Sequence, residues 1–414
     1  MKNYTLHTPE GVKDYIGAEA YLKEKIQNKI KDIFHTYSYN LIETPTFEYL
    51  DVFTLGEAGL QHPDLYNLVN RQGELVALRS DMTRAIARVV STQNSNMPIP
   101  QRYAYMANSF RYPERYQGKL HEFTQAGIEL VGKNSAEADA EVIKVAIEAL
   151  KAAGLSDFTM HIGSIAFLEY ILSDLGLNDE DKQAVYHAIE CKDAVGLKSI
   201  LESSNREADT LSLLLELIQC AGKIDLLRSI KQKITCPKSK QALTYLENIY
   251  EILEEYNISE QILFDFSILS YGKYYTGIMF QAFTRGIGSA IVEGGRYDTL
   301  LCKFGEDQPA VGFGIHINLL LQKIMQQEPL PSTNATKTLI VYTKETRKQA
   351  LKAADGFRKE GLVVENSFFE TIEEALKYAK EVDLGGVLYF KQEDRVEVYH
   401  LKENTMEETT ISKL

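Results

Sequence analysis

The stretch from Phe110 to Glu129 limits what this chain folds into more than any other part of the sequence. Its pattern predicts two antiparallel strands joined by a turn at Gln117-Gly118. Side chains are expected to alternate along the returning strand at three positions, Phe123, Gln125 and Ile128. We therefore expect the rest of the chain to be organised around this hairpin.

Three polar side chains belong to the predicted hairpin. Arg111 stands where the first strand begins, and Gln125 and Glu129 follow on the returning strand. They put a cation, an amide and a carboxylate on one surface of a sheet, a set that can hold the two ends of a small zwitterion. The alternative is a surface hairpin with scattered charges, which contribute little to binding or stability. Other segments of the chain decide between the two interpretations.

Three further segments carry motifs that match one family in the right order. They are Thr44-Pro-Thr-Phe-Glu48, Leu78-Arg-Ser-Asp-Met-Thr83, and Tyr274-Tyr-Thr-Gly277 followed by Gly294-Gly-Arg-Tyr-Asp298. With the hairpin, they resemble the motifs of class II aminoacyl-tRNA synthetases in the form found in histidyl-tRNA synthetase, over roughly residues 8 to 320. The synthetase has Glu-Gly-Thr where this chain has Asp-Met-Thr. That variant is similar to the family of ATP phosphoribosyltransferase regulatory subunits, which are synthetase paralogues in histidine biosynthesis.

The resemblance implies an α+β fold, a class II synthetase-like antiparallel sheet flanked by helices, over residues 1–325. Leucine-rich helical periods between about 177 and 258 predict an all-helical insertion in this core. Residues 326–337 have the composition of a linker. Alternating strand and helix patterns then predict a small α/β domain over 338–414, with four strands and two helices. It resembles a reduced anticodon-binding domain.

Asp81 has two interpretations. Ser80 is expected to cap a helix whose apolar face carries Met82, Ile86 and Val89. Asp81 would then be a first-turn carboxylate that interacts favourably with the helix dipole, which is worth roughly 0.5 kcal/mol. The family resemblance favours the other interpretation, in which Asp81 binds an α-ammonium group.

The resemblance implies a slot for histidine. Asp81 and Gln125 would bind the ammonium group with Thr83 beside them, and Arg111 would hold the carboxylate. Glu129 and Tyr275 would bind the ring nitrogens. The remaining matches are Tyr297, which would line the slot, and two flanking residues, Tyr274 and Arg296. The structural alternatives are a Tyr-Tyr pair that only packs and a Gly294-Gly295 bend.

Several departures from the synthetase pattern bear on catalysis. Ser270 stands where the resemblance places an arginine that neutralises charge on the α-phosphate, and Leu319 where motif 3 ends in an arginine that clamps ATP. Motif 2 has Pro113 in place of a glutamate, and Glu114 follows one position late. Loss of one such cationic donor commonly reduces the rate by about 10²- to 10³-fold. We therefore expect no catalytic residues in this chain.

Composition narrows the possible partners and locations. The chain has 414 residues, with 45 Lys and Arg against 58 Asp and Glu, which disfavours a long nucleic-acid footprint. No apolar run approaches the ~20 residues that span a bilayer, and the N-terminus has no signal-peptide pattern. The four cysteines, Cys191, Cys220, Cys236 and Cys302, are too widely spaced for a zinc site. We expect a cytoplasmic protein without metal, cofactor, membrane or tRNA.

The residues and the resemblance together predict a regulatory protein that keeps the amino-acid slot and has lost the chemistry. The implied partner is the short-form ATP phosphoribosyltransferase catalytic subunit, with L-histidine as feedback effector and a homodimer within a larger hetero-oligomer. Two alternatives stay open. One is an active histidyl-tRNA synthetase, and the other is a tRNA-binding paralogue without a metabolic partner.

Overall fold

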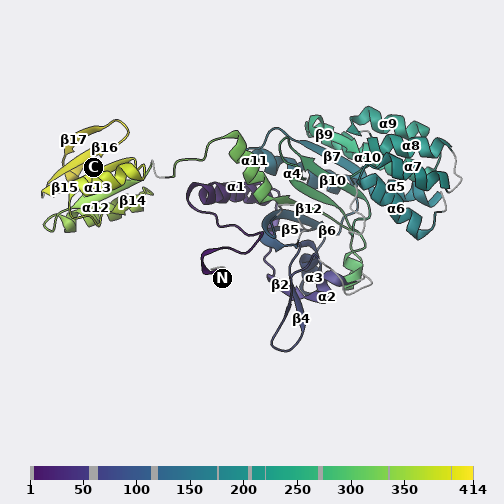
Figure 1. Cartoon of the computed structure of the whole chain (residues 1–414), viewed down its shortest axis with the longest axis horizontal. Coiled ribbons are helices and arrows are strands. Elements are labelled where there is room, and N and C mark those ends of the chain that lie inside the picture. Colours follow the sequence, from purple (N-terminus) through teal and green to yellow (C-terminus); the bar gives the residue numbers. More distant parts are fainter. Residues whose placement is uncertain are drawn as a thin grey trace. The chain divides into compact units, whose positions relative to one another are not determined.

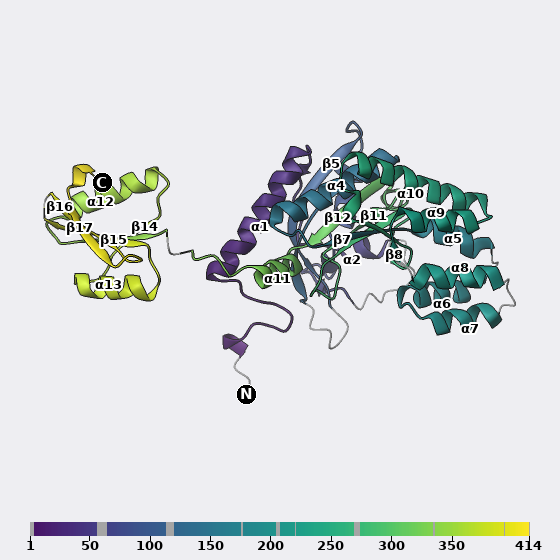
Figure 2. The same ribbon diagram turned by 90° about the horizontal axis from the view of Figure 1, so that it is seen from above.

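The computed structural model describes residues 4–55, 64–112, 120–174, 177–203, 208–219, 221–268, 274–333, 336–392 and 394–413. The chain divides into two compact units. One consists of Met1–Asp14 with Lys23–Glu328, and the other of Tyr15–Leu22 with Pro329–Leu414. The division falls within the first helix, α1 (Gly17–Thr36). Figures 1 and 2 give two views of the chain.

A large sheet forms the centre of the first unit. Within the described residues it has nine strands in the order β1-β5-β6-β12-β11-β10-β7-β9-β8. Their bounds are β1 Asn40–Leu41, β5 Gln101–Phe110, β6 Glu122–Val131, β7 Thr159–Ser164, β8 Ala221–Gly222, β9 Ile262–Asp265, β10 Ile278–Phe283, β11 Val292–Arg296 and β12 Ala310–His316. The strands from β5 to β7 pair antiparallel, whereas β1 and β9 join by parallel pairing. The predicted antiparallel sheet flanked by helices is confirmed.

One face of this sheet forms an apolar core with the helices that cover it. The rings of Phe34 from α1, Phe280 and Phe313 pack edge to face, with centroids 6.0 and 6.5 Å apart. The helix α4 (Ala136–Ala153) lies along the same sheet in both views, and it begins at a Ser135 cap and ends at Gly154, whose φ is 105°. A left-handed C-cap of this kind favours glycine.

The opposite face of the sheet carries α3 (Thr83–Gln93). The apolar face of α3 packs with Tyr105 in a buried cluster. This corrects the sequence expectation in two ways. Met82, not Ser80, is the N-cap, and the buried positions are Met82, Ile86 and Val90, whereas Val89 is only half-buried. The Ser80 carbonyl instead accepts a hydrogen bond from Arg111.

The hairpin that was predicted around the motif is formed by β5 and β6, which pair over ten residues. The expected turn at Gln117-Gly118 lies outside the described residues. One expected position was wrong: Ile128 lies on the opposite face of β6 from Phe123 and Gln125, because successive residues of a strand alternate between faces. Ile128 therefore belongs to the core beneath the sheet.

The segment after α5 (Ile165–Asp174) is largely helical, with helices packed on one another at one end of the large sheet (Figure 2). The helices are α6 Asp179–Glu190, α7 Ala194–Ser203, α8 Ala208–Gln219, α9 Ile224–Lys233 and α10 Pro237–Glu255. The pattern predicted no strand here, but β8 pairs with β9. A two-residue strand is too short to give a periodic signal.

A small three-stranded sheet, in the order β2-β4-β3, adjoins α2 (Leu50–Thr54). Its strands are β2 Phe47–Tyr49, β3 Asn67–Val69 and β4 Leu75–Leu78. The register puts Phe47, Tyr49 and Leu68 on one face, where each is at least half exposed. This face is an apolar surface of the first unit.

The second unit has a five-stranded sheet in the order β14-β13-β15-β16-β17, with α12 (Arg347–Lys359) on one face and α13 (Ile372–Glu381) on the other. Its strands are β13 Thr338–Tyr342, β14 Val364–Asn366, β15 Gly386–Gln392, β16 Arg395–His400 and β17 Thr405–Thr409. The sequence pattern did not predict β17, because its residues are mostly exposed and polar. The α11 helix (Ile317–Gln327) precedes this unit.

Across the described ranges, no helix combines the length and the apolar character that crossing a bilayer requires. Cys191, Cys236 and Cys302 are free thiols, and Cys220 is not among the described residues. The same ranges contain no group of three or more His, Cys, Asp or Glu side chains arranged to hold a metal ion.

Candidate functional site

A floor of glycines lies under the polar side chains of β6. The register pairs Glu129 with Gly312 and Gly127 with Gly314, so these residues share one face of the sheet. A Cβ at Gly312 would meet the Glu129 carboxylate, and a Cβ at Gly314 would meet the Gln125 amide. The side chains of Gln125 and Glu129 therefore lie over β12 where neighbouring side chains are missing.

Glu129 is the most buried ionisable side chain among those on this face of β6, with 1% of its surface exposed. Its carboxyl group accepts hydrogen bonds from the Thr83 hydroxyl at 2.7 Å and from the Tyr297 hydroxyl. Burial raises the pKa of Glu129 to about 8, although both hydroxyls act to lower it, and the negative charge of Asp81 raises it further. Near neutral pH the group is therefore a carboxylic acid that can give up its proton to a basic ligand.

Three tyrosines form one wall beside Glu129. The Tyr274 ring lies 5.2 Å from that of Tyr275 and 5.5 Å from that of Tyr297, and Tyr297 is 3% exposed. Burial raises the pKa of all three hydroxyls, and the charges of Glu129 and Asp81 contribute for Tyr274 and Tyr275. The hydroxyls therefore stay protonated and can donate hydrogen bonds.

Two charged residues of the predicted site come from the segment after β5 and from the segment before α3. Arg111 follows β5, donates from Nε to the Ser80 carbonyl at 3.0 Å, and lies over the Phe123 ring at 5.6 Å. Asp81 is half-buried, and its carboxylate accepts from the Arg84 backbone at 3.3 Å. Asp81 thus precedes the Met82 N-cap and does not lie in the first turn of α3, where the dipole interpretation placed it.

The structure brings the eight predicted slot residues to one side of the sheet. We call this group the slot: Asp81, Thr83, Arg111, Gln125, Glu129, Tyr274, Tyr275 and Tyr297. Burial raises the pKa of the Tyr105 and Tyr275 hydroxyls, and the negative charge of Asp81 raises it further while Arg111 lowers it. Acceptors, donors and a buried carboxyl group thus lie on one side of the sheet.

Arg296, which matched a flanking position, does not belong to the slot. Its guanidinium lies on the face of the sheet that α4 covers. There it forms a buried ion pair with Asp139 of α4, with an N–O distance of 2.5 Å. Neighbouring residues of a strand point to opposite faces, so Tyr297 enters the slot while Arg296 leaves it. The cation at this position is a structural one.

Two features were missed by sequence reasoning. The glycine floor had a signal, because Gly312 and Gly314 stand two apart and share a strand face. The stack of His316 on Phe123, with ring centroids 4.5 Å apart and 13° between planes, had none, because it joins distant parts of the chain. Leu319 lies in the first turn of α11, and its backbone N–H donates to the His316 ring at 3.4 Å. Its side chain is aliphatic. Ser270 and Pro113 lie outside the described residues.

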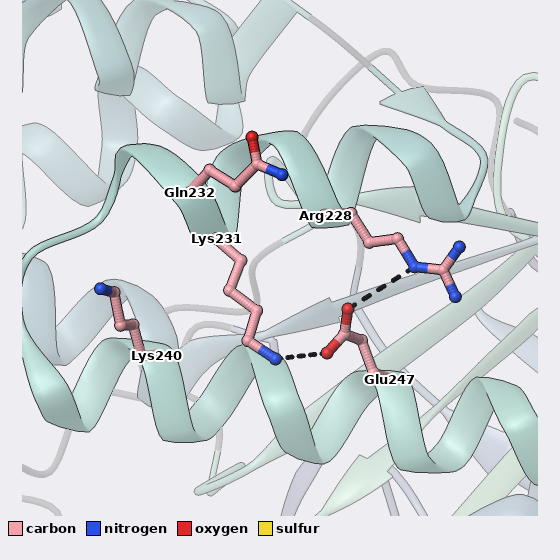
Figure 3. A pocket seen from close by; sticks show the side chains of 5 residues that line it. All are labelled: Arg228, Lys231, Gln232, Lys240 and Glu247. Carbon is pink, nitrogen blue, oxygen red and sulfur yellow. Dashed lines mark hydrogen bonds and ion pairs between the residues drawn. The ribbon is translucent and has the colours of Figure 1, made fainter.

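A separate groove of about 390 Å³ lies between α9 and α10 (Figure 3). Its residues are Arg228, Lys231, Gln232, Lys240 and Glu247. Glu247 accepts from Lys231 and lies 3.8 Å from Arg228. Because the central carboxylate already pairs with two of the cations, and Arg228 is more than half exposed, we interpret the groove as a solvated set of ion pairs.

Comparison with known proteins gives consistent results. A family model described as histidyl-tRNA synthetase matches residues 11–320. Relatives from Ruminiclostridium cellulolyticum and Acetivibrio thermocellus, both named ATP phosphoribosyltransferase regulatory subunit, are each 34% identical to this chain. Each alignment covers 100% of this chain and 99% of the relative.

Solved structures agree on the fold. One from Bacillus halodurans C, described as an ATP phosphoribosyltransferase regulatory subunit/histidyl-tRNA synthetase, is 30% identical with a TM-score of 0.84 and covers 95% of this chain and 100% of that one. A histidyl-tRNA synthetase from Nostoc sp. PCC 7120 is 21% identical with a TM-score of 0.83, covering 98% of this chain and 97% of that one. The predicted class II synthetase-like fold is thereby confirmed.

Proposed function

This chain belongs to the family of ATP phosphoribosyltransferase regulatory subunits, and from this premise we propose that it binds L-histidine in the slot and regulates a separate catalytic subunit. The partner would be the short-form ATP phosphoribosyltransferase, which carries out the first step of histidine biosynthesis. The chain would raise the activity of that subunit, and histidine would lower it.

The observation that carries the proposal is the chemistry around Glu129. Free histidine presents an ammonium group, a carboxylate and an imidazole. Asp81 and Gln125 offer acceptors for the ammonium group, and Arg111 offers a cation for the carboxylate. Glu129, with Tyr275 beside it, offers a buried carboxyl group that can exchange a proton with the ring. Each end of the ligand thus has a partner of matching chemistry.

We propose that the chain itself is not catalytic. Adenylate formation needs cations at the developing phosphate charge. At the end of the motif that should carry an ATP-binding arginine, this chain has Leu319. Ser270 replaces a second arginine. Both losses support a role in binding and signalling instead of aminoacylation.

A homodimer within a larger hetero-oligomer is part of the same proposal. The exposed apolar face of Phe47, Tyr49 and Leu68 supports an interface in the first unit, because contiguous apolar surface on a soluble protein commonly marks an association site. The α1 helix, which lies at the dimer interface in the family, is the second candidate for this interface.

Reconstitution tests the proposal directly. The full chain is mixed with a short-form catalytic subunit from the same source, and phosphoribosyl-ATP formation is followed with and without L-histidine. We expect activity that depends on the mixture and falls as histidine is added. Absence of activation would contradict the proposal. Histidine-dependent pyrophosphate exchange with ATP by the chain alone would favour an active synthetase instead.

A further inference from the structure

The buried ion pair behind the slot joins three separate elements. Asp139 of α4, which is fully buried, receives the guanidinium of Arg296 from β11 at 2.5 and 3.0 Å. It also accepts the hydroxyl of Tyr245 at 2.8 Å. Tyr245 belongs to α10 in the helical insertion. A single carboxylate therefore holds the central sheet, its covering helix and the insertion together.

Electrostatics favour keeping this cluster intact. Burial acts to lower the pKa of Arg296, but the charge and the hydrogen bonds of Asp139, with the charge of Asp298, raise it above its ordinary value. Burial and the charge of Asp139 raise the pKa of Tyr245, so its hydroxyl stays a donor. Removal of a donor would leave a buried carboxylate with fewer partners, which is unfavourable in a dry interior. The Tyr245 hydroxyl thus connects α10 to the sheet through the Asp139 carboxylate.

The chain next to Arg296 leads directly into the slot. Tyr297 follows it and donates to Glu129. The backbone at this end of β11 is hydrogen-bonded on both sides. The Tyr297 backbone donates to Ala310 at 2.8 Å, and the Thr276 backbone donates to Arg296 at 2.8 Å. One short backbone segment thus carries both the side chain that binds Asp139 and the side chain that binds Glu129.

We propose that Tyr245 is a positioning residue that couples the helical insertion to the slot through Asp139, Arg296 and Tyr297. Binding of histidine, which rests on the function proposed above, then stabilises α10 locally. By linkage, the factor by which histidine favours the closed state of α10 equals the factor by which closure of α10 raises histidine affinity. The helical insertion is then a second region whose state changes the affinity of the slot for histidine.

Hydrogen exchange of the full chain, with and without L-histidine, tests the coupling. In the wild type we expect histidine to slow amide exchange in β6, β11 and β12 and also in residues 237–255 of α10. The Tyr245→Phe variant removes only the hydroxyl, so we expect protection of the strands to persist while protection of α10 is lost. Tyr250→Phe, on the same helix and half-buried, is the matched control and should behave as the wild type.

Calorimetric titration supplies the reciprocal measurement. Tyr245→Phe should bind histidine about 2- to 10-fold more weakly than the wild type, the range expected for one hydrogen bond, and Tyr250→Phe should be unchanged. A residue with only a structural role would lower the melting temperature without removing ligand-dependent protection in α10.

The possible failures are distinguishable. Protection confined to the strands in the wild type, or α10 protection that survives in Tyr245→Phe, overturns the coupling and leaves histidine binding intact. A wild-type chain that gives neither heat nor protection with histidine overturns the proposed function and the coupling together.

Discussion

Glu129 and Asp139 are both almost completely buried carboxyl groups, and they lie on opposite sides of the same sheet. Asp139 has a guanidinium and a hydroxyl as partners. Glu129 has two hydroxyls, and its pKa rises to about 8. Burial raises the pKa of Asp139 as well, but the charge and the hydrogen bonds of Arg296 act against that rise, whereas Glu129 has neutral donors only. The first is a structural pair, and the second is suited to meet a basic ligand.

The largest effect is expected where the fixed cation loses its buried partner. Asp139→Ala leaves the Arg296 guanidinium with only Asp298 and the Lys133 carbonyl, which we expect to lower the free energy of unfolding by about 3–5 kcal/mol. Urea denaturation followed by circular dichroism measures it. Asp139→Ala with Arg296→Met also removes the buried cation and should recover part of the loss. A single-variant loss below about 1 kcal/mol would show that the pair is not structural.

At Glu129 the comparison predicts a loss of binding. We expect Glu129→Gln to weaken histidine binding by about 1.5–3 kcal/mol, the value of a hydrogen bond to a charged group, as measured by calorimetry. Unchanged affinity in this variant would mean that the ligand binds elsewhere.

The Glu129→Gln variant should weaken histidine binding but raise the stability of the folded protein at alkaline pH. The folded pKa of about 8 exceeds the value of 4.5 for an unperturbed glutamate. Between these values the native state holds a proton that the unfolded state has lost, so stability falls as the pH rises through this window. Glu129→Gln should therefore raise the melting temperature at pH 8.5 and change it little at pH 5.

These two carboxyl groups also mark how far the sequence alone leads. The family and the fold class were predicted from ordered motifs, and full-length relatives and solved structures agree. The hairpin around the first motif was predicted from its local pattern, and β5 and β6 form it. Register was harder, because the side a residue faces depends on its pairing partners, as the error at Ile128 illustrates.

The role of Arg296 illustrates a second limit. Its motif position suggested a place beside the slot, but it pairs with Asp139, which also binds Tyr245, and both residues are far away in the sequence. No local pattern links three elements that meet only after packing. The slot assignments themselves stay predictions, since they concern a ligand. Short exposed strands such as β8 and β17 were missed for the simpler reason that they bury too little to give a pattern.

A smaller and more specific effect is expected from pH. In the complex, Glu129 and the imidazole would share one proton. Below the imidazole pKa of about 6.5 binding must release a proton, and above the Glu129 pKa of about 8 it must take one up. Affinity should be flat between these values and fall by about 1.4 kcal/mol per pH unit on either side. Calorimetry across pH 5 to 9.5 measures this profile.

The control for this profile is again Glu129→Gln. The α-ammonium group of histidine also titrates at alkaline pH, so the informative quantity is the difference between the two proteins. The variant should lose the part of the alkaline decline that begins near pH 8 and keep the rest. Identical profiles would contradict the shared proton.

The smallest effect is expected at the hydroxyl that donates to Glu129 from α3. Thr83→Val keeps the shape of the side chain and removes the donor, so we expect histidine affinity to fall by about 0.5–1.5 kcal/mol. The Thr83 hydroxyl lowers the pKa of Glu129, so its loss should also move the alkaline decline to higher pH. Thr124→Val is the matched control, because Thr124 is equally buried and its hydroxyl donates to Asn108 on the other face of β6. If both variants changed affinity alike, the effect of Thr83→Val would not come from its hydrogen bond to Glu129.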